Sequence, residues 1–254
     1  MSTTADDIAS WMRGQVQISG ARGFVVGLSG GVDSAVVARL CQLATPDEVV
    51  GVIMPCHSEP RDRDDARLVA AHFSLPVLEV DLAPAYDVLV AGATAALAGA
   101  PPAMRADGPT DDVRGRLPLA NTKPRLRMTT LFFVANSLNY LVAGTGNRSE
   151  IAIGYYTKYC DGGVDLLPIG RLLKREVRAL ARALDVPEAI IEKAPSAGLW
   201  LGQTDESEMG FTYDDLERYL TQGPEAISPA LTLRIERLMR VSEHKRALPP
   251  MPEA

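Results

Sequence analysis

The sequence predicts an α/β protein with a doubly wound, mostly parallel β-sheet and a helical C-terminal part. Short apolar runs in the first half of the chain have the composition of strands buried on both faces. Longer segments between them carry apolar residues three and four positions apart, as amphipathic helices do. The C-terminal third shows the helical pattern without further strand candidates. Strands that alternate with helices form a parallel sheet with right-handed crossovers.

The first strand and helix candidates alternate along the chain. Strands are expected at Gly23 to Leu28, Glu48 to Met54 and Leu75 to Val80, and helices between them at Ser34 to Ala44 and Pro60 to Phe73. Each strand candidate is a short apolar run, so we expect all of them to be buried on both faces. Each helix candidate is long enough to return the chain to the start of the next parallel strand.

A fourth strand is expected at Tyr140 to Ala143, directly after a helix at Arg125 to Asn139. The helix is predicted because a set of apolar side chains falls on one stripe of its surface. This stripe consists of Met128, Leu131, Phe132, Ala135 and Leu138. The sheet should therefore contain four or five strands. Further helices are expected at Tyr213 to Leu220 and after Ser228, where serine followed by proline is typical of a helix start.

Two stretches, residues 97–124 and 198–212, are expected to be mobile loops. The first is rich in Gly, Pro, Ala and Asp. A loop of this length is either a disordered connector or a segment that orders over a bound substrate, and the sequence leaves both interpretations open. We expect residues 1–254 to form a single domain.

The composition excludes several classes of function. The chain has 26 Lys and Arg against 32 Asp and Glu, a net charge of −6 and a pI near 5.2. It therefore lacks the cationic surplus that binding nucleic acid or an anionic membrane requires. Three cysteines at wide spacings provide neither a disulfide framework nor a zinc pattern, and no secretory signal or membrane-spanning stretch is evident. We expect a cytoplasmic enzyme or binding protein, without a nucleic-acid or membrane partner.

Candidate chemistry begins in the turn Ser29 to Ser34, which follows the first strand and opens the first helix. Gly30 and Gly31 let the backbone approach a phosphate, and the amides and dipole of the first helical turn favour an anion. Asp33 stands where a Walker A loop has lysine. A carboxylate directed at phosphates requires a cation between them, so Asp33 implies Mg²⁺.

This turn resembles the SGGxDS signature of the PP-loop ATP pyrophosphatases, which cleave ATP between the α and β phosphates and adenylate an oxygen of their second substrate. Later segments are similar to the successive signatures of one of these subfamilies, the ammonia-dependent NAD⁺ synthetases. They are Asn121 to Met128, Gly144 to Glu150, Gly154 to Ile169, Pro195 to Trp200, Gln203 to Glu206 and His244 to Arg246. The resemblance runs from about Gly23 to Pro249. It implies an adenine nucleotide alpha hydrolase-like, Rossmann-like fold.

The resemblance also implies roles for individual residues. The residues at ATP-binding positions are Gly27, Leu28, Ser29, Gly30, Gly31, Val32, Asp33, Ser34, Thr145, Lys174 and Ser196. Those at positions that bind deamido-NAD⁺ are Arg127, Lys158, Asp165, His244 and Lys245. Mg²⁺ would be held by Asp33 and Glu150. The catalytic residues would be Asp33, Asp161 and Lys174, with Asp161 near the incoming ammonia. Members of this family form homodimers, so a homodimer is implied as well.

The implied reaction is the ATP-dependent amidation of deamido-NAD⁺ by ammonia through an NAD-adenylate, the last step of NAD⁺ biosynthesis, with release of AMP and pyrophosphate. A carboxylate does not react with ammonia at neutral pH because oxide would have to leave, and adenylation supplies a better leaving group. The phosphates then need positive charge, which Mg²⁺ and Lys174 provide. Asp161 is a candidate general base that accepts the proton of ammonium.

Several alternatives stay open at this point. The acceptor could be that of a tRNA-modifying or GMP-forming relative, or the chain could be a non-catalytic adenine-nucleotide-binding module. Lys174 could belong to the solvated face of a helix, and Glu150 could pair with Arg148 on the surface. Cys160 occupies a position that is usually glycine in the family. Only residues 1–22 precede the first strand, so no glutamine amidase domain is expected there, and either free ammonia or a separate glutaminase would supply nitrogen.

Overall fold

The computed structural model describes residues 4–101, 113–196 and 204–252 and has an α/β fold. Its strands are β1 (Gly23–Gly27), β2 (Val49–Ile53), β3 (Val77–Glu79) and β4 (Tyr140–Ala143). They form one parallel sheet in the order β3-β2-β1-β4. Val25 of β1 is paired with Val50 of β2 on one side and with Val142 of β4 on the other. The predicted parallel sheet is confirmed, and β4 has the predicted bounds.

The strand order determines where a ligand can bind. The chain moves from β1 outward to β2 and β3, and then returns to the other side of β1 to form β4. The connections after β1 and β4 therefore diverge and leave a crevice at the carboxyl ends of these two strands. In open parallel sheets, such a switch point is the usual ligand site.

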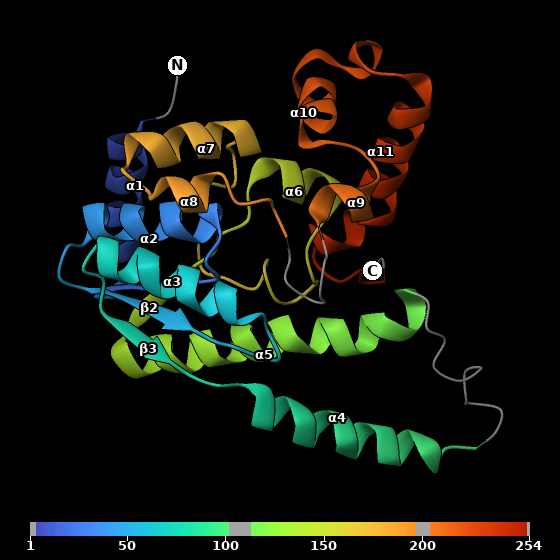
Figure 1. The fold of residues 1–254 in the computed structure, drawn as a ribbon, viewed down its shortest axis with the longest axis horizontal. Coiled ribbons are helices and arrows are strands. Elements are labelled where there is room, and N and C mark those ends of the chain that lie inside the picture. Colours follow the sequence, from blue (N-terminus) through green and yellow to red (C-terminus); the bar gives the residue numbers. More distant parts are fainter. Residues whose placement is uncertain (1–3, 102–112, 197–203, 253–254) are drawn as a thin grey trace.

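Helices cover both faces of the sheet (Figure 1). One face packs against α1 (Ala5–Ser19), α2 (Val32–Ala44), α3 (Pro60–His72), α7 (Lys174–Ala183) and α8 (Glu188–Ile191). The other face packs against α5 (Val113–Leu138), with α4 (Ala83–Ala98) lying outside it. In β1, Phe24 and Val26 face the first core whereas Val25 faces the second, so the strand is buried on both sides as predicted.

The C-terminal helical part has a separate core, beside the sheet region in Figure 1. It comprises α9 (Asp205–Met209), α10 (Tyr213–Gln222), η2 (Pro224–Ala226), α11 (Pro229–Val241) and η3 (Glu243–Lys245). Its buried side chains pack against Ile153 of α6 (Arg148–Ile153), so α6 joins this part to the sheet region. Ser228 caps α11 as predicted, with its hydroxyl accepting a hydrogen bond from the Leu231 amide.

Some expectations were wrong. The third strand is not buried on both faces, because β3 lies at the edge of the sheet and exposes about two fifths of Val77 and Leu78. Of the predicted loop 97–124, residues 102–112 lie outside the described part of the chain, and most of the described remainder is helical. Helix α4 continues to Ala98 and α5 begins at Val113, so the predicted helix start at Arg125 lies well inside α5.

The prolines at 118 and 124 explain that error, since proline lacks an amide donor and usually ends a helix. Here Ala120, between the two prolines, is buried, and packing of this kind offsets their cost. Of the second predicted loop, residues 198–203 lie outside the described part of the chain, and most of the remainder forms α9 rather than a loop. Helices α1 and α4 have no counterpart in the prediction. None of the described helices is both long and apolar enough to cross a bilayer.

Candidate active site at the carboxyl edge of the sheet

The turn between β1 and α2 is shaped to accept an anion. Gly30 has φ of 77°, and a Cβ there would lie only 2.5 Å from the Asp62 carbonyl oxygen. Only glycine therefore fits at this position. The Ser29 and Ser34 hydroxyls lie 3.0 Å apart, and the Ser34 hydroxyl donates to the Gly31 carbonyl oxygen at 2.9 Å. The turn is thus held in shape while the N-terminus of α2 faces the cavity.

Three charged side chains meet beside this turn. The Lys174 ammonium, at the start of α7, donates to Asp33 of α2 and, over 3.1 Å, to Glu150 of α6. Only 4% of the Lys174 side chain is exposed, so it is not on a solvated helix face. Burial alone would lower the pKa of Lys174, but the two carboxylates outweigh it and raise the pKa, so the ammonium stays charged. Burial has the opposite effect on a carboxylate and raises the pKa of Glu150, although the positive charge of Lys174 acts to lower it.

Local sequence places Glu150 at this point. Asn147 is the N-cap of α6, where its side chain accepts from the Glu150 amide at 3.1 Å, and the Glu150 carboxylate accepts from the Asn147 amide at 3.4 Å. This capping box fixes Glu150 in the first helical turn. The Asn147 side-chain amide also donates to Asp33 at 3.1 Å. Arg148 instead reaches the Leu220 carbonyl oxygen, so the alternative of a surface pair with Glu150 is wrong.

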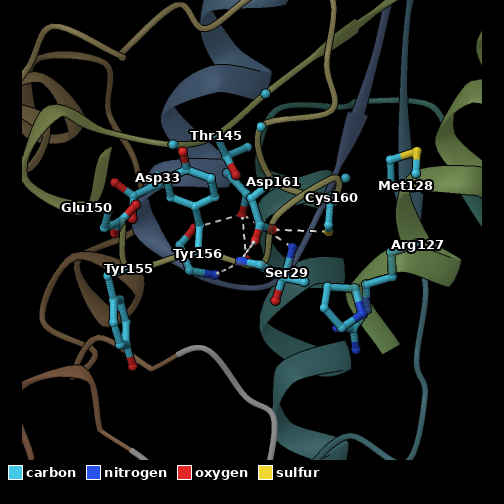
Figure 2. A pocket seen from close by; sticks show the side chains of 18 of the residues that line it. Ser29, Asp33, Arg127, Met128, Thr145, Glu150, Tyr155, Tyr156, Cys160 and Asp161 are labelled. Carbon is cyan, nitrogen blue, oxygen red and sulfur yellow. Dashed lines mark hydrogen bonds between the residues drawn. The ribbon is translucent and has the colours of Figure 1, made fainter. Parts of the chain in front are cut away.

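A cavity of about 1080 Å³ opens from this cluster. Most of the residues expected from the sequence line it. They are Gly27, Leu28, Ser29, Gly31, Val32, Asp33, Ser34, Arg127, Thr145, Glu150, Lys158, Asp161, Lys174, Ser196, His244 and Lys245. Figure 2 shows Asp33 and Glu150 toward one side of the cavity and Arg127 toward the other, with Asp161 between them.

Two of the expected residues do not line the cavity. Gly30 faces α3 rather than the cavity, and its close approach to Asp62 and Asp65 fixes the shape of the turn. The Asp165 carboxylate accepts a hydrogen bond from the Val142 amide at 2.7 Å and so stabilises the end of β4. The predicted contact of Asp165 with deamido-NAD⁺ stays a prediction. The carboxylate is directed at β4 and not into the cavity.

Asp161 lies in a tight turn after α6. Its carboxylate accepts from the Thr157 amide at 2.9 Å, and the neighbouring Cys160 thiol lies 3.4 Å from its other oxygen (Figure 2). Cys160 is buried, and burial raises the pKa of its thiol well above the ordinary value. A protonated, buried thiol is a poor nucleophile. The turn therefore accommodates the Cys160 side chain, and burial keeps its thiol protonated.

The basic residues come from two directions. Arg127 of α5 is held at the end of β2 by hydrogen bonds of 3.1 Å to the Met54 carbonyl oxygen and the Ser58 hydroxyl. Lys158 and His244 lie 3.0 Å apart, between the Lys158 ammonium and the His244 Nδ1. Lys245 donates to the Gly154 and Tyr156 carbonyl oxygens at 2.6 Å each. Burial lowers the pKa of Lys245, and Asp161 opposes this.

Further residues of the site were missed by sequence reasoning. Lys193 lines the cavity and lies 2.9 Å from Asp62 and 2.6 Å from Asp65, both on α3. Asp205, in the segment Gln203 to Glu206 that carries the resemblance, also lines the cavity and accepts from the Tyr213 hydroxyl at 2.8 Å. The motif was a signal for Asp205, but nothing in the sequence pointed to Lys193 or Tyr213.

A parallel sheet with an anion-binding turn and a buried lysine between two carboxylates defines a nucleotide-binding α/β protein of the PP-loop type. The chain belongs to the NAD synthase family, whose model matches residues 4–249.

Named relatives agree with this assignment over almost the whole chain. An NH(3)-dependent NAD(+) synthetase from Carboxydothermus hydrogenoformans is 51% identical over 247 residues, which cover 97% of this chain and 96% of the relative. The structure of NMN synthetase from Francisella tularensis matches with a TM-score of 0.87 at 33% identity, covering 98% of this chain and 97% of that one. The NH3-dependent NAD synthetase from Campylobacter jejuni matches with a TM-score of 0.77 at 28% identity, covering 98% and 97%.

Proposed function

We propose that this protein is an NH₃-dependent NAD⁺ synthetase, a ligase that forms a C–N bond by amidating deamido-NAD⁺ with ATP and ammonia. The observation that carries the proposal is the placement of Asp33, Glu150 and Lys174 beside the phosphate-binding turn, in one cavity with Arg127 and Asp161. One cavity thus contains groups suited to phosphates, to an anionic second substrate and to ammonium.

The first step joins the substrate carboxylate to the α-phosphate of ATP. Both partners are anions, so positive charge at the phosphates lowers the barrier. Lys174 supplies a buried ammonium that stays charged. Backbone amides at the start of α2 add hydrogen-bond donors for the phosphates, and these donors are already oriented before the reaction begins. Arg127 lies toward the other side of the cavity, where it can hold the anionic dinucleotide.

Asp33 and Glu150 fit Mg²⁺, because both carboxylates line the cavity beside the phosphate-binding turn and each has a second oxygen that does not accept from Lys174. Within the described residues, no set of three or more His, Cys, Asp or Glu side chains is placed to hold a metal ion. A site with two carboxylates suits Mg²⁺ that takes its remaining ligands from substrate phosphates and water. When bound, Mg²⁺ would neutralise phosphate charge as pyrophosphate departs.

The second step replaces AMP by ammonia. Asp161 lines the cavity and is held by the Thr157 amide, so its carboxylate has a fixed position. A carboxylate there attracts ammonium and can accept its proton, which leaves neutral ammonia to attack the acyl adenylate. The relatives are named NH(3)-dependent, which supports free ammonia as the nitrogen source rather than a separate glutaminase.

The homodimer implied by the resemblance has a candidate surface. Helix α4 buries only Tyr86 of its 16 residues. Val88 is 76% exposed on α4 and Phe133 is 73% exposed on α5, and the two helices pack side by side. Exposed apolar side chains on two neighbouring helices indicate an interface, and the proposed occupant is a second copy of this chain. Replacing Val88 and Phe133 by Glu should convert a dimer to a monomer in analytical ultracentrifugation, whereas Leu233→Glu on α11, which is 68% exposed, should not.

The function is tested by incubating the purified protein with ATP, Mg²⁺, ammonium and deamido-NAD⁺. Equimolar NAD⁺, AMP and pyrophosphate should form, and omitting either deamido-NAD⁺ or ammonium should abolish NAD⁺ formation. Nicotinate mononucleotide must be compared as substrate, because one similar structure is an NMN synthetase. A higher kcat/KM for the mononucleotide, or pyrophosphate release with neither nicotinate nucleotide, would overturn the proposed substrate.

A further inference from the structure

Helix α10 belongs to the C-terminal core, yet Tyr213 contacts the charged cluster of the active site and Glu217 contacts the residues next to that cluster in the chain. Tyr213 and Glu217 are four residues apart and so lie on one face of the helix. Tyr213 is 4% exposed and Glu217 is fully buried. A buried glutamate needs polar partners, and those of Glu217 lie outside α10.

Glu217 holds the start of α7, the helix that begins with Lys174. One oxygen of its carboxylate accepts from the Arg175 amide and from the Ser149 hydroxyl, both at 3.1 Å. The Ser149 oxygen in turn accepts from the Lys174 amide at 3.1 Å. Two free amides at the N-terminus of α7 are thereby satisfied, and the negative charge of Glu217 is favourable there.

Tyr213 contacts the side chains of the same cluster. Its hydroxyl donates to Asp205 at 2.8 Å and lies 3.3 Å from the Glu150 carboxylate. The Lys174 ammonium lies 5.3 Å from the centre of its ring, within the range of a cation–π contact. Tyr213 thus touches both Glu150 and Lys174 through different parts of one rigid side chain.

We propose that Tyr213 and Glu217 are positioning residues, through which α10 sets the geometry of Glu150 and Lys174 around Asp33. Ser149 and Glu150 are adjacent on α6, and Lys174 and Arg175 are adjacent on α7. Glu217 therefore ties together the backbones that carry the two charged groups, and Tyr213 packs against the groups themselves. The C-terminal part is in this way coupled to ATP binding. The inference rests on the proposed function only in its use of the amidation assay.

The test compares Tyr213→Phe, Glu217→Ala and Glu217→Gln with the wild type. Tyr213→Phe removes the hydroxyl and keeps the ring, and Glu217→Gln keeps an oxygen that can accept from Ser149 and Arg175. Displacing a reacting group by an ångström can cost about a hundredfold in rate. We expect Glu217→Ala to raise the KM for ATP and to lower kcat by about tenfold or more, with Tyr213→Phe and Glu217→Gln intermediate and the KM for deamido-NAD⁺ little changed.

The matched control is Tyr219→Phe on the same helix, whose hydroxyl reaches only Glu236, at 3.5 Å, among the hydrogen bonds of the described residues. It should leave the KM for ATP and kcat unchanged. Calorimetric titration with a non-hydrolysable ATP analogue and Mg²⁺ gives a readout without deamido-NAD⁺. If the wild type binds the analogue but makes no NAD⁺, the proposed function fails while this inference is still tested.

Two outcomes would overturn the inference. One is wild-type affinity for the analogue in both Tyr213→Phe and Glu217→Ala. The other is a purely structural effect of Glu217→Ala. In that case its loss of activity would equal its loss of folded protein, measured by thermal melting. The KM for ATP would be unchanged, and Glu217→Gln would recover no activity.

Discussion

The sheet region and the C-terminal helical part contribute to the cavity in different ways. The sheet region supplies a continuous turn, Ser29 to Ser34, whose backbone and hydroxyls form the anion site. The C-terminal part supplies separated side chains: Asp205 of α9 and Lys245 of η3 line the cavity, and Tyr213 of α10 contacts Asp205. Phosphate binding through backbone amides requires consecutive residues, whereas positioning through side chains does not. The first kind of site therefore stands in one continuous motif, whereas the second is spread over short separate segments, of which those with Asp205 and Lys245 carried a signal and Tyr213 carried none.

The largest effect is expected in the phosphate-binding turn. Asp33→Asn removes the charge that pairs with Lys174 and that fits Mg²⁺. Loss of one such electrostatic partner costs about 10²- to 10³-fold in rate, and we expect kcat for NAD⁺ formation to fall by about that factor. The measurement is steady-state NAD⁺ production at saturating ATP and Mg²⁺. Circular dichroism should show that the fold is kept, and near wild-type turnover in a folded Asp33→Asn protein would contradict the assignment.

A smaller and more selective effect is expected from the C-terminal part. Lys245→Met removes two hydrogen bonds to the backbone at Gly154 and Tyr156, which line the cavity. The backbone at these two residues would then lose its anchor beside the proposed dinucleotide site, and we expect the KM for deamido-NAD⁺ to rise about tenfold, which corresponds to about 1.4 kcal/mol of binding free energy. The KM for ATP should stay close to the wild-type value. Equal increases in both constants would show that Lys245 does not act on the dinucleotide selectively.

The difference between a site built from consecutive residues and one built from separated side chains explains how much of the molecule could be predicted from the sequence. The apolar runs identified β1, β2 and β4 because buried parallel strands leave a local pattern. The residues of the turn Ser29 to Ser34 were identified because they are consecutive in the sequence, so the whole phosphate-binding site forms one motif. Asp165 was assigned to the dinucleotide from its place in a motif, and its bond to Val142 appears only once β4 and the segment after α6 are side by side.

The lack of a local pattern also explains why helix α4 was missed. Helix α4 exposes most of its apolar residues, so it lacks the amphipathic pattern that predicts a helix packed on a core. Lys193 was missed for a similar reason. It is a single lysine whose partners Asp62 and Asp65 lie far away in the sequence, and no local pattern marks such a cluster.

A third prediction concerns stability in the sheet region. Gly30→Ala places a methyl group against the Asp62 carbonyl oxygen in a left-handed conformation, which by itself costs about 1–2 kcal/mol. We expect the free energy of unfolding to fall by at least that amount in urea denaturation. Gly14→Ala is the matched control, because Gly14 lies inside α1 with nothing within 4 Å of its added Cβ. The control should gain about 0.5–1 kcal/mol, and the same sign for both variants would contradict this account of the turn.

The smallest effect is expected at the amino edge of the sheet, away from the cavity. Tyr140 begins β4, and its hydroxyl donates to the Glu48 carboxylate. Partial burial, together with this bond, raises the pKa of Tyr140 to about 12. A group whose pKa is raised by folding stabilises the protein below its unfolded value, near 10 for tyrosine, and loses that contribution as the pH rises through the folded value. The melting temperature should therefore fall between pH 10 and pH 12 by more in the wild type than in Tyr140→Phe, while both proteins make NAD⁺ at the same rate at neutral pH. A reduced rate in Tyr140→Phe would show that the amino edge also shapes the active site and would remove the distinction between the two edges.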